Sequence, residues 1–241
     1  MKEDKILLKL SGEALENKKD NLIFDGSLIK SIAEQINELS NLGYKVGVVV
    51  GGGNIWRGKL HDILKIDQES ADYMGMLSTV INSIALANIL RQNFNTKVNV
   101  YNSLEVNIPN NFIKYNSKKI SKQFDKKGLV SIFAGGTGKP FFSTDTSVAQ
   151  KAVAAKVNRI LIGKFGTDGV YDKDPNEFKD AKFIKEITFK DALKKDLKVM
   201  DKKALEILEN KNIEVVIFDI LEKNSIIKAI KDDSFKKTKM N

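Results

Sequence analysis

The stretch Val46-Gly47-Val48-Val49-Val50-Gly51-Gly52-Gly53-Asn54 decides the fold of this chain. Its first five residues are apolar on both faces, as in the buried strands of parallel sheets, and three glycines follow at once. Three other apolar runs end in glycine-containing loops: Ile6–Leu10 before Ser11-Gly12, Leu129–Ala134 before Gly135-Gly136-Thr137-Gly138, and Arg159–Ile162 before Gly163–Gly169. Glycine lets the backbone approach a ligand closely, and ligands of open α/β sheets bind at the carboxyl ends of the strands. The four loops together predict a cradle for phosphate groups.

Strand-like and helix-like patterns alternate along the rest of the chain. The predicted strands are Ile6–Leu10, Val46–Val50, Val98–Tyr101, Leu129–Ala134, Arg159–Ile162 and Ile213–Ile220. The predicted helices are Leu28–Leu42, Ala71–Phe94, Thr144–Val157, Leu193–Asn212 and Ser225–Ile230. Repeated strand–loop–helix order is typical of a mostly parallel central sheet sandwiched between helices, a three-layer α/β/α fold. The stretch Asn102–Lys127 is open to a loop excursion or a small hairpin, and the charged tail Lys231–Asn241 is expected to be frayed.

The helix predicted over Ala71–Phe94 is apolar nearly all round, so it must be buried in the core or in an interface between subunits. Its apolar side chains cover more than one stripe: Met74, Leu77, Val80, Ile81, Ile84, Leu86, Ile89 and Leu90. Burying one face therefore leaves another apolar face to cover. Because large exposed apolar patches are rare on soluble monomers, we expect an oligomer.

Composition favours a soluble protein with one domain over residues 1–241. The chain is 42% hydrophobic, and no run approaches the ~18 apolar residues of a membrane span. Residues Met1–Lys5 lead directly into a strand without the apolar region of a signal peptide, which favours a cytoplasmic protein. With no cysteine and one histidine, His61, the chain offers no thiolate ligands and little basis for a metal centre.

The formal net charge of +9 is compatible with a nucleic-acid partner or with any ligand that carries phosphate. The basic residues are nearly all lysines, spread along the chain among Asp and Glu, which favours a solvated surface. The arginines are Arg57, Arg91 and Arg159. With so few of them, the position of Arg57 four residues after Gly53 indicates a functional role.

The common phosphate-binding fingerprints do not fit. A P-loop requires Ser or Thr after its Gly-Lys pair, whereas Gly138-Lys139 is followed by Pro140, and Phe133 stands where the first glycine belongs. In the dinucleotide fingerprint, Trp56 stands where the last glycine belongs. The chain is therefore neither an ordinary P-loop protein nor an ordinary Rossmann dehydrogenase.

Several charged residues have both a functional and a structural interpretation. Lys9 interrupts an apolar strand, so either its ammonium group emerges at the strand end toward an anion or the side chain snorkels to water. The planar fork of Arg57 could grip phosphate oxygens, or it could be a surface cation. Asp145 could act at a reaction centre or cap the helix that begins there, and Asp201 fits the N-cap of a later helix.

The motifs resemble one known family when they are taken in order. They are Lys9-Leu10-Ser11-Gly12-Glu13-Ala14-Leu15, Gly51-Gly52-Gly53-Asn54-Ile55-Trp56-Arg57-Gly58, Asp72-Tyr73-Met74-Gly75-Met76, Gly136-Thr137-Gly138-Lys139-Pro140-Phe141-Phe142-Ser143-Thr144-Asp145, Asp168-Gly169-Val170-Tyr171-Asp172-Lys173-Asp174-Pro175 and Lys198-Val199-Met200-Asp201. From about Ile6 to Ile220 the chain resembles the bacterial uridylate kinases (UMP kinases) of the amino-acid kinase superfamily. The resemblance implies the reaction ATP + UMP → ADP + UDP, a step of pyrimidine nucleotide biosynthesis.

The resemblance also implies roles for individual residues. It assigns Lys9, Asp145 and Lys164 to the reaction centre. It places ATP at Lys9, Leu10, Ser11, Gly12, Gly53, Arg57, Phe165, Tyr171 and Asp174. It places UMP at Gly52, Asp72, Thr137, Gly138, Lys139, Pro140, Phe141, Phe142, Ser143 and Thr144. Phe165 departs from the usual polar residue of the family, which leaves backbone or stacking contact with the nucleotide. Residues of about 1–150 would form the acceptor lobe and about 151–241 the ATP lobe.

Further expectations concern cofactors and partners. Mg²⁺ would be held largely by the ATP phosphates and water, as is usual for this ion, so no dedicated metal ligands are predicted. The resemblance implies a homohexamer, inhibition by UTP and, frequently, activation by GTP. Neither a membrane nor a nucleic acid is required.

Two alternatives remain open at this point. One is another small-molecule kinase of the same superfamily, which would make an acyl phosphate from an amino acid or from carbamate. The other is a nucleic-acid-binding or regulatory protein that uses the +9 charge, and its binding would weaken steeply with salt.

Overall fold

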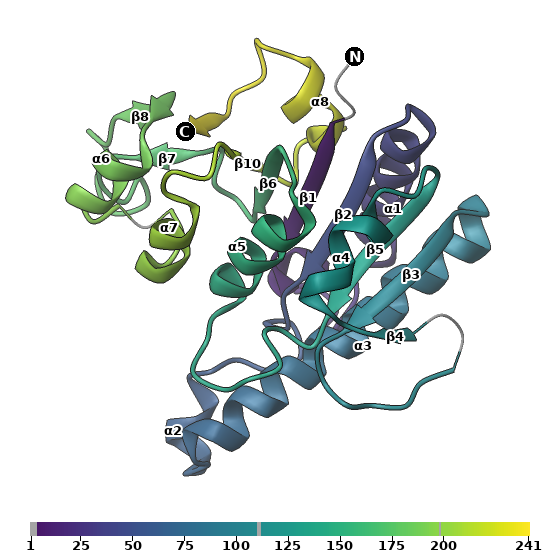
Figure 1. Cartoon of the computed structure of the whole chain (residues 1–241). Helices are drawn as coiled ribbons and strands as arrows, with labels where there is room; N and C mark the ends of the chain where they lie inside the picture. The colour runs from purple at the N-terminus through teal and green to yellow at the C-terminus, as the bar shows by residue number, and fades with distance from the viewer. Residues whose placement is uncertain (1–3, 110–111, 198) are drawn as a thin grey trace.

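The computed structural model describes residues 4–109, 112–197 and 199–241. Within these residues, nine strands form one sheet in the order β4-β3-β5-β2-β1-β6-β10-β11-β9 (Figure 1). The strands are β1 (Lys5–Leu10), β2 (Lys45–Val50), β3 (Lys97–Asn102), β4 (Phe112–Lys114), β5 (Leu129–Ala134), β6 (Arg159–Lys164), β9 (Glu186–Ile187), β10 (Glu214–Asp219) and β11 (Thr238–Met240). Neighbouring strands run parallel except β10 and β11. The short strands β7 (Val170–Tyr171) and β8 (Phe183–Ile184) pair apart from this sheet.

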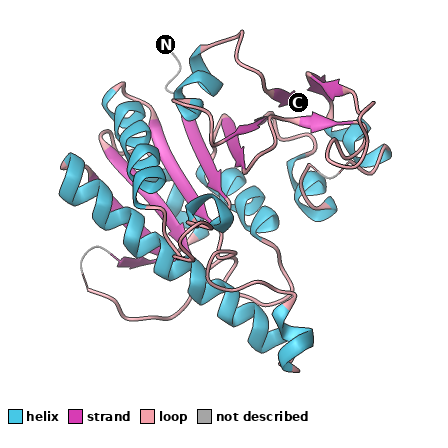
Figure 2. Ribbon diagram, turned by 180° about the vertical axis from the view of Figure 1, so that it is seen from behind, coloured by secondary structure: helices cyan, strands magenta, loops and turns pink. Residues whose placement is uncertain are grey.

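Helices cover both faces of the sheet, as Figures 1 and 2 show from opposite sides. One face carries α1 (Gly26–Asn41), α3 (Gln68–Phe94) and α8 (Ser225–Lys231). The other carries α4 (Ser117–Phe124), α5 (Thr144–Ala155), α6 (Phe189–Lys194) and α7 (Lys202–Leu208). Side chains of β1 alternate between them, because Ile6 and Leu8 join the first core cluster and Leu7 joins the second. The predicted three-layer α/β/α fold is confirmed.

The order of the strands changes direction at β1. The connection after β1 leads to β2 on one side, whereas the connection after β5 returns the chain to β6 on the other side of β1. Ligands of open α/β sheets bind at such a switch point. The predicted glycine-containing loops follow β1, β2, β5 and β6, and the fold therefore brings them to one edge of the sheet.

The tail Lys231–Asn241 was expected to be frayed, and this prediction was wrong. Its strand β11 pairs antiparallel with β10, and the side chains of Thr238 and Met240 are buried. The hydroxyl of Thr238 also accepts a hydrogen bond from the backbone N–H of Val170 (2.9 Å) and donates one to the carbonyl of Ile184 (2.5 Å). The tail is held because it joins the main sheet to β7 and β8.

Two other predicted stretches differ in detail. The helix expected over Leu193–Asn212 is two helices, α6 and α7, because Asp196 has a φ of 49° and Asp201 caps a new helix. The stretch Asn102–Lys127 is neither a loop excursion nor a hairpin. It adds β4 beside β3 and then forms α4, which Asn116 caps.

By length and composition, α3 alone among the described helices could cross a membrane, and half of its most apolar window is buried inside the molecule. Its packing against the sheet makes it a core helix. A separate exposed stripe runs along it, formed by Tyr73, Met74, Leu77 and Ile81. Leu77 is 45% exposed and Ile81 46%, whereas Val80 between them is 4% exposed. The expectation of two apolar faces on this helix is confirmed.

Candidate active site

Lys9, Asp145 and Lys164 come together at the carboxyl ends of β1 and β6. The ammonium group of Lys9 forms an ion pair with Oδ1 of Asp145, and both side chains are mostly buried. Burial lowers the pKa of Lys164, the charge of Lys9 lowers it further, and the charge of Asp145 acts in the opposite direction. Both Lys9 and Asp145 thus lie close enough to Lys164 to influence its charge, and the three side chains form one charged cluster at the strand ends.

Asp145 does not cap its helix. The N-cap of α5 is Ser143, whose hydroxyl accepts a hydrogen bond from the backbone N–H of Thr146 (3.0 Å). The capping alternative for Asp145 is therefore wrong, and its carboxylate is held by Lys9 and by the backbone N–H of Asp201 (3.3 Å). The first turn of α5 thus brings a negative charge to the end of β1.

The loops after β1 and β2 pack directly against each other. A Cβ on Gly12 would overlap the backbone nitrogen of Gly53, and a Cβ on Gly52 would lie 2.8 Å from the carbonyl oxygen of Gly75 on α3. Only glycine fits at either position. Ser11 caps the short 3₁₀ helix that begins at Gly12, and the side chain of Leu10 is fully buried.

A cavity of about 230 Å³ opens between the β2 loop, α3 and the β5–α5 loop, and we call it the acceptor cavity. The predicted UMP residues that line it are Gly52, Asp72, Lys139, Phe142, Ser143 and Thr144. The others, Thr137, Gly138, Pro140 and Phe141, belong to the same β5–α5 loop. The carboxylate of Asp72 accepts a hydrogen bond from the backbone N–H of Phe141 (2.6 Å), so α3 also holds the far part of this loop.

A second cavity, of about 300 Å³, lies on the other side of Lys164, and we call it the donor cavity. Three residues predicted for the reaction centre or ATP line it, namely Lys164, Tyr171 and Asp174. The carboxylate of Asp174 accepts the backbone N–H of Asn176 (2.9 Å), which makes the expected Asp-Pro turn part of the cavity wall. Lys164 belongs to this wall and to the charged cluster, and Asp145 of the cluster follows Thr144, which lines the acceptor cavity.

Comparison with known proteins gives the same result along the whole chain. A profile of the amino acid kinase family matches residues 4–219. The chain is 42% identical to the uridylate kinase of Mycoplasma capricolum over 227 residues, 94% of each chain, and 42% identical to that of Mycoplasmopsis pulmonis over 94% of this chain and 92% of the relative. The chain belongs to the uridylate kinases of the amino acid kinase family.

Solved structures of this family have the same fold. The UMP kinase from Ureaplasma parvum superposes with a TM-score of 0.91 at 37% identity, and the comparison covers 100% of both chains. The UMP kinase from Bacillus anthracis superposes with a TM-score of 0.89 at 34% identity, over 99% of this chain and 96% of the other. These comparisons cover the part of the chain that carries the expected motifs, from about Ile6 to Ile220. The resemblance to uridylate kinases is therefore confirmed.

Most residues expected at ATP lie outside the walls of the donor cavity, and Gly53 lines the acceptor cavity instead. Those outside are Lys9, Leu10, Ser11, Gly12, Gly53, Arg57 and Phe165. Phe165 packs against the core, and the ammonium group of Lys18 lies 4.6 Å from the centre of its ring. Arg57 donates hydrogen bonds to Glu16 (2.8 Å) and to the carbonyl of Gly53 (3.2 Å). The roles of Phe165 and Arg57 toward ATP stay predictions.

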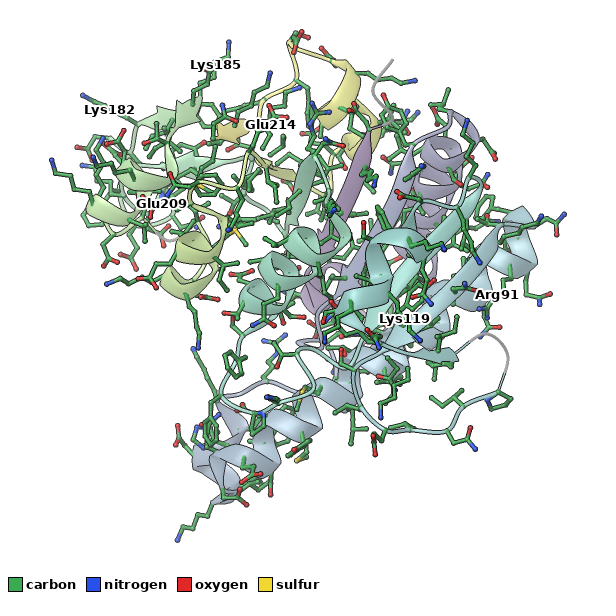
Figure 3. The ribbon with its side chains drawn as sticks, in the orientation of Figure 1. Arg91, Lys119, Lys182, Lys185, Glu209 and Glu214 are labelled. Carbon is green, nitrogen blue, oxygen red and sulfur yellow. The ribbon has the colours of Figure 1, made fainter. Side chains whose placement is uncertain are left out.

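The other two arginines have structural partners away from the site. Arg159 forms an ion pair with Glu214, labelled in Figure 3, where β6 and β10 begin, at the opposite end of the sheet. Arg91, also labelled, donates to the carbonyl of Val98 (2.9 Å) near the end of α3. Of the three arginines, Arg57 is the one beside a glycine-containing loop that is predicted to bind phosphate.

Sequence reasoning missed two residues of α3 that hold the site loops. Asn82 is fully buried and donates to the carbonyl of Gly51 (2.7 Å), and it exchanges hydrogen bonds with the side chain of Asn54. The hydroxyl of Thr79 accepts the backbone N–H of Gly135 (2.9 Å). The signal in the sequence was a polar strip, formed by Ser78, Thr79, Asn82 and Ser83, in an otherwise apolar helix.

Asp201 links α7 to the start of α5. Its carboxylate accepts the backbone N–H of Ala204 (2.9 Å), which confirms its predicted role as an N-cap. The same carboxylate accepts hydrogen bonds from the hydroxyls of Ser143 and Thr146 (3.3 Å for Thr146). The ammonium group of Lys203, two residues further on, lies 4.0 Å from the centre of the Phe142 ring. Acceptor-cavity residues are therefore tied to α7.

Proposed function

We propose that this chain transfers the γ-phosphoryl group of ATP to UMP, giving ADP and UDP. The observation that carries the proposal is the cluster of Lys9, Asp145 and Lys164, in which Lys164 lines the donor cavity and Asp145 follows Thr144 of the acceptor cavity. Phosphoryl transfer needs little beyond positioning of the reactants and neutralisation of the charge that develops. Membership in the uridylate kinases supports UMP as the acceptor and ATP as the donor.

In this proposal the two cavities hold the two nucleotides. UMP occupies the acceptor cavity, with its phosphate toward the N–H groups of Gly52 and Gly53 and its ribose toward Asp72. ATP occupies the donor cavity, with its triphosphate reaching Ser11, Gly12 and Arg57. Lys9 and Lys164 then neutralise the negative charge of the phosphoryl group during its transfer, and Asp145 orients Lys9. Residues of about 1–150 form the acceptor lobe and about 151–241 the ATP lobe.

The donor set of the protein fits a magnesium ion that arrives with ATP. In the described part of the chain, no three His, Cys, Asp or Glu side chains gather at one place that could hold a metal. Mg²⁺ prefers oxygen ligands and keeps several waters, so the ATP phosphates would supply most of its coordination. The ion would add further neutralisation of phosphate charge.

We also propose an oligomer that buries the exposed stripe of α3. Large apolar patches on soluble proteins mark interaction sites, and this stripe is continuous along one side of the helix. By family resemblance the assembly is a homohexamer in the cytoplasm, where it acts in pyrimidine nucleotide biosynthesis. Inhibition by UTP and activation by GTP are part of the same proposal.

The test is a coupled assay of ADP release with UMP, CMP, dCMP and AMP as acceptors, each with and without GTP and UTP. We expect a strong preference for UMP and a loss of activity when Mg²⁺ is chelated. Comparable kcat/KM for CMP would contradict the acceptor assignment. Activity on amino acids or carbamate, with none on UMP, would instead favour a different branch of the superfamily.

A further inference from the structure

Lys151 of α5 is a buried cation that the proposed reaction does not use. Lys151 is only 2% exposed, and none of the oxygens that accept hydrogen bonds from its ammonium group belongs to a carboxylate. The ammonium group donates to the carbonyl of Gly136 (2.5 Å), to the hydroxyl of Ser147 (3.0 Å) and to that of Ser103 (3.4 Å). It also lies 4.7 Å from the centre of the Tyr115 ring.

A buried ammonium group is costly, so its partners matter. Burial lowers the pKa of Lys151 to about 7. The three N–H donors of an ammonium group match the three oxygen acceptors, and an aromatic face adds attraction. The charged form is thus satisfied by hydrogen bonds alone. An apolar side chain would fill the same volume without this cost, which indicates that the contacts themselves are useful.

The contact with Gly136 connects Lys151 to the acceptor cavity. Gly136 lines that cavity, has a φ of 55°, and a Cβ on it would lie 3.0 Å from Met76, another lining residue. The hydroxyl of Ser103 donates to the same Gly136 carbonyl (3.1 Å). On the other side, Thr79 holds the N–H of Gly135. The start of the β5–α5 loop is therefore held by a hydrogen bond from α3 on one side and by a hydrogen bond from Lys151 on the other.

We propose that Lys151 is a positioning residue for the acceptor nucleotide: by fixing the Gly136 carbonyl, it sets the course of the loop from Gly136 to Thr144. This inference rests on the proposed function. It predicts an effect on UMP and not on ATP, because no residue of the donor cavity contacts Lys151.

The experiment compares Lys151→Met and Lys151→Arg with wild type in two independent measurements. Binding of UMP is followed by the fluorescence of Trp56, the single tryptophan, which lines the acceptor cavity. Steady-state kinetics give KM for UMP and for ATP separately. Loss of a charge-assisted hydrogen bond should raise Kd and KM for UMP in Lys151→Met by roughly tenfold, with KM for ATP nearly unchanged. Lys151→Arg should restore most of the affinity.

Matched variants separate positioning from general destabilisation. Val157→Ala removes a buried apolar group beyond the end of α5 and should leave both KM values unchanged. If Lys151→Met does not fold, Ser103→Ala and Ser147→Ala are compared instead. The hydroxyl of Ser103 donates to the Gly136 carbonyl, so its removal should weaken UMP binding. The hydroxyl of Ser147 contacts only the lysine, so its removal should not.

Different results would contradict the role of Lys151 and the proposed function. Equal increases in KM for UMP and ATP, or equal effects of Ser103→Ala and Ser147→Ala, would overturn the role of Lys151. A wild-type protein whose Trp56 fluorescence does not respond to UMP, and which does not phosphorylate it, would overturn the proposed function instead.

Discussion

The ammonium group of Lys9 pairs with the carboxylate of Asp145 at the end of β1, and the charges of both act on the nearby Lys164. An incoming phosphoryl group would meet two ammonium groups in a partly buried setting, where electrostatic interactions are stronger than in water. Lys9 ends up there because it is the next-to-last residue of β1, with its backbone held by β2 and β6 on both sides.

Lys9→Met should therefore lower kcat by about 10²–10³-fold, the usual effect of removing one preorganised charge contact in a transition state. The fold should persist, because the Met side chain is similar in length and apolar. Coupled-assay kinetics measure the first effect, and a circular dichroism melt checks the second. Near-normal kinetics with a normal melt would identify Lys9 as a structural cation.

Substitution of Asp72 and of Asp174 tests which cavity takes which nucleotide. Asp72 lines the acceptor cavity and Asp174 the donor cavity, so Asp72→Asn should mainly raise KM for UMP and Asp174→Asn mainly KM for ATP. Each KM is measured with the other substrate saturating, and each variant serves as the control for the other. The reverse pattern would show that the two nucleotides occupy the opposite cavities.

The pKa of Lys151 makes a prediction about stability. This pKa is about 7 in the folded protein and 10.5 for a free lysine side chain, so between these pH values the unfolded chain binds a proton that the folded chain does not. Stability rises with pH wherever the unfolded state binds more protons. Urea denaturation between about pH 7 and 10.5 should show wild type gaining stability relative to Lys151→Met. Parallel curves for the two proteins would contradict the lowered pKa.

At this scale, the sequence predicts the residues whose chemistry is unusual for their position. Lys9 is a cation inside an apolar strand, and the loop glycines follow strand ends. The sequence did not reveal the roles of Thr79, Asn82 and Lys151, because their residue types are ordinary for their positions. Each is a polar residue on a helix, which ordinarily faces water, and their burial depends on packing between distant segments.

At the scale of elements, α3 has three faces with different tasks. One face packs on the sheet, the polar strip holds the β2 and β5 loops, and the third face is the exposed apolar stripe. Asn82→Ala should lower the free energy of unfolding by about 1–3 kcal/mol, because it leaves buried polar groups unpaired, and should raise KM for UMP.

The matched control for Asn82→Ala is Asn88→Ala on the same helix. Asn88 is exposed and hydrogen-bonds only to the carbonyl of Ile84 one turn earlier (3.0 Å). A thermal melt and UMP kinetics on both variants give the comparison. If the two variants behave alike, the contacts of Asn82 with the β2 loop have no energetic role.

Element boundaries were predictable where periodicity and capping agree, as at Thr144 for α5. The predicted boundaries were wrong where a local capping signal was given less weight than the spacing of apolar residues. The break between α6 and α7 was visible as the N-cap Asp201, yet the helical spacing of apolar residues continued across it. The tail failed because its charge suggested solvent, whereas Thr238 and Met240 alternate inward as a strand.

For the whole molecule, the exposed stripe of α3 sets the expected assembly. Light scattering should report a mass several times the chain mass of 26.9 kDa, six times for a homohexamer. Leu77→Glu combined with Ile81→Lys should break the assembly by placing charges in an apolar interface. A charge placed at the exposed Asn93, which lies about 120° around the helix from Ile81, is the control. A wild-type monomer would contradict the oligomer.

The way the tail enters the sheet has a consequence for synthesis. Strand β9 joins the main sheet only through β11, and the N–H of Phe189 at the start of α6 is bonded to Asn241. On the ribosome, the segment around β9 and α6 leaves the exit tunnel well before β11 does. Until β11 appears, β9 lacks its partner in the main sheet and the N–H of Phe189 lacks its acceptor, so a chaperone that shields this segment would meet it in that interval.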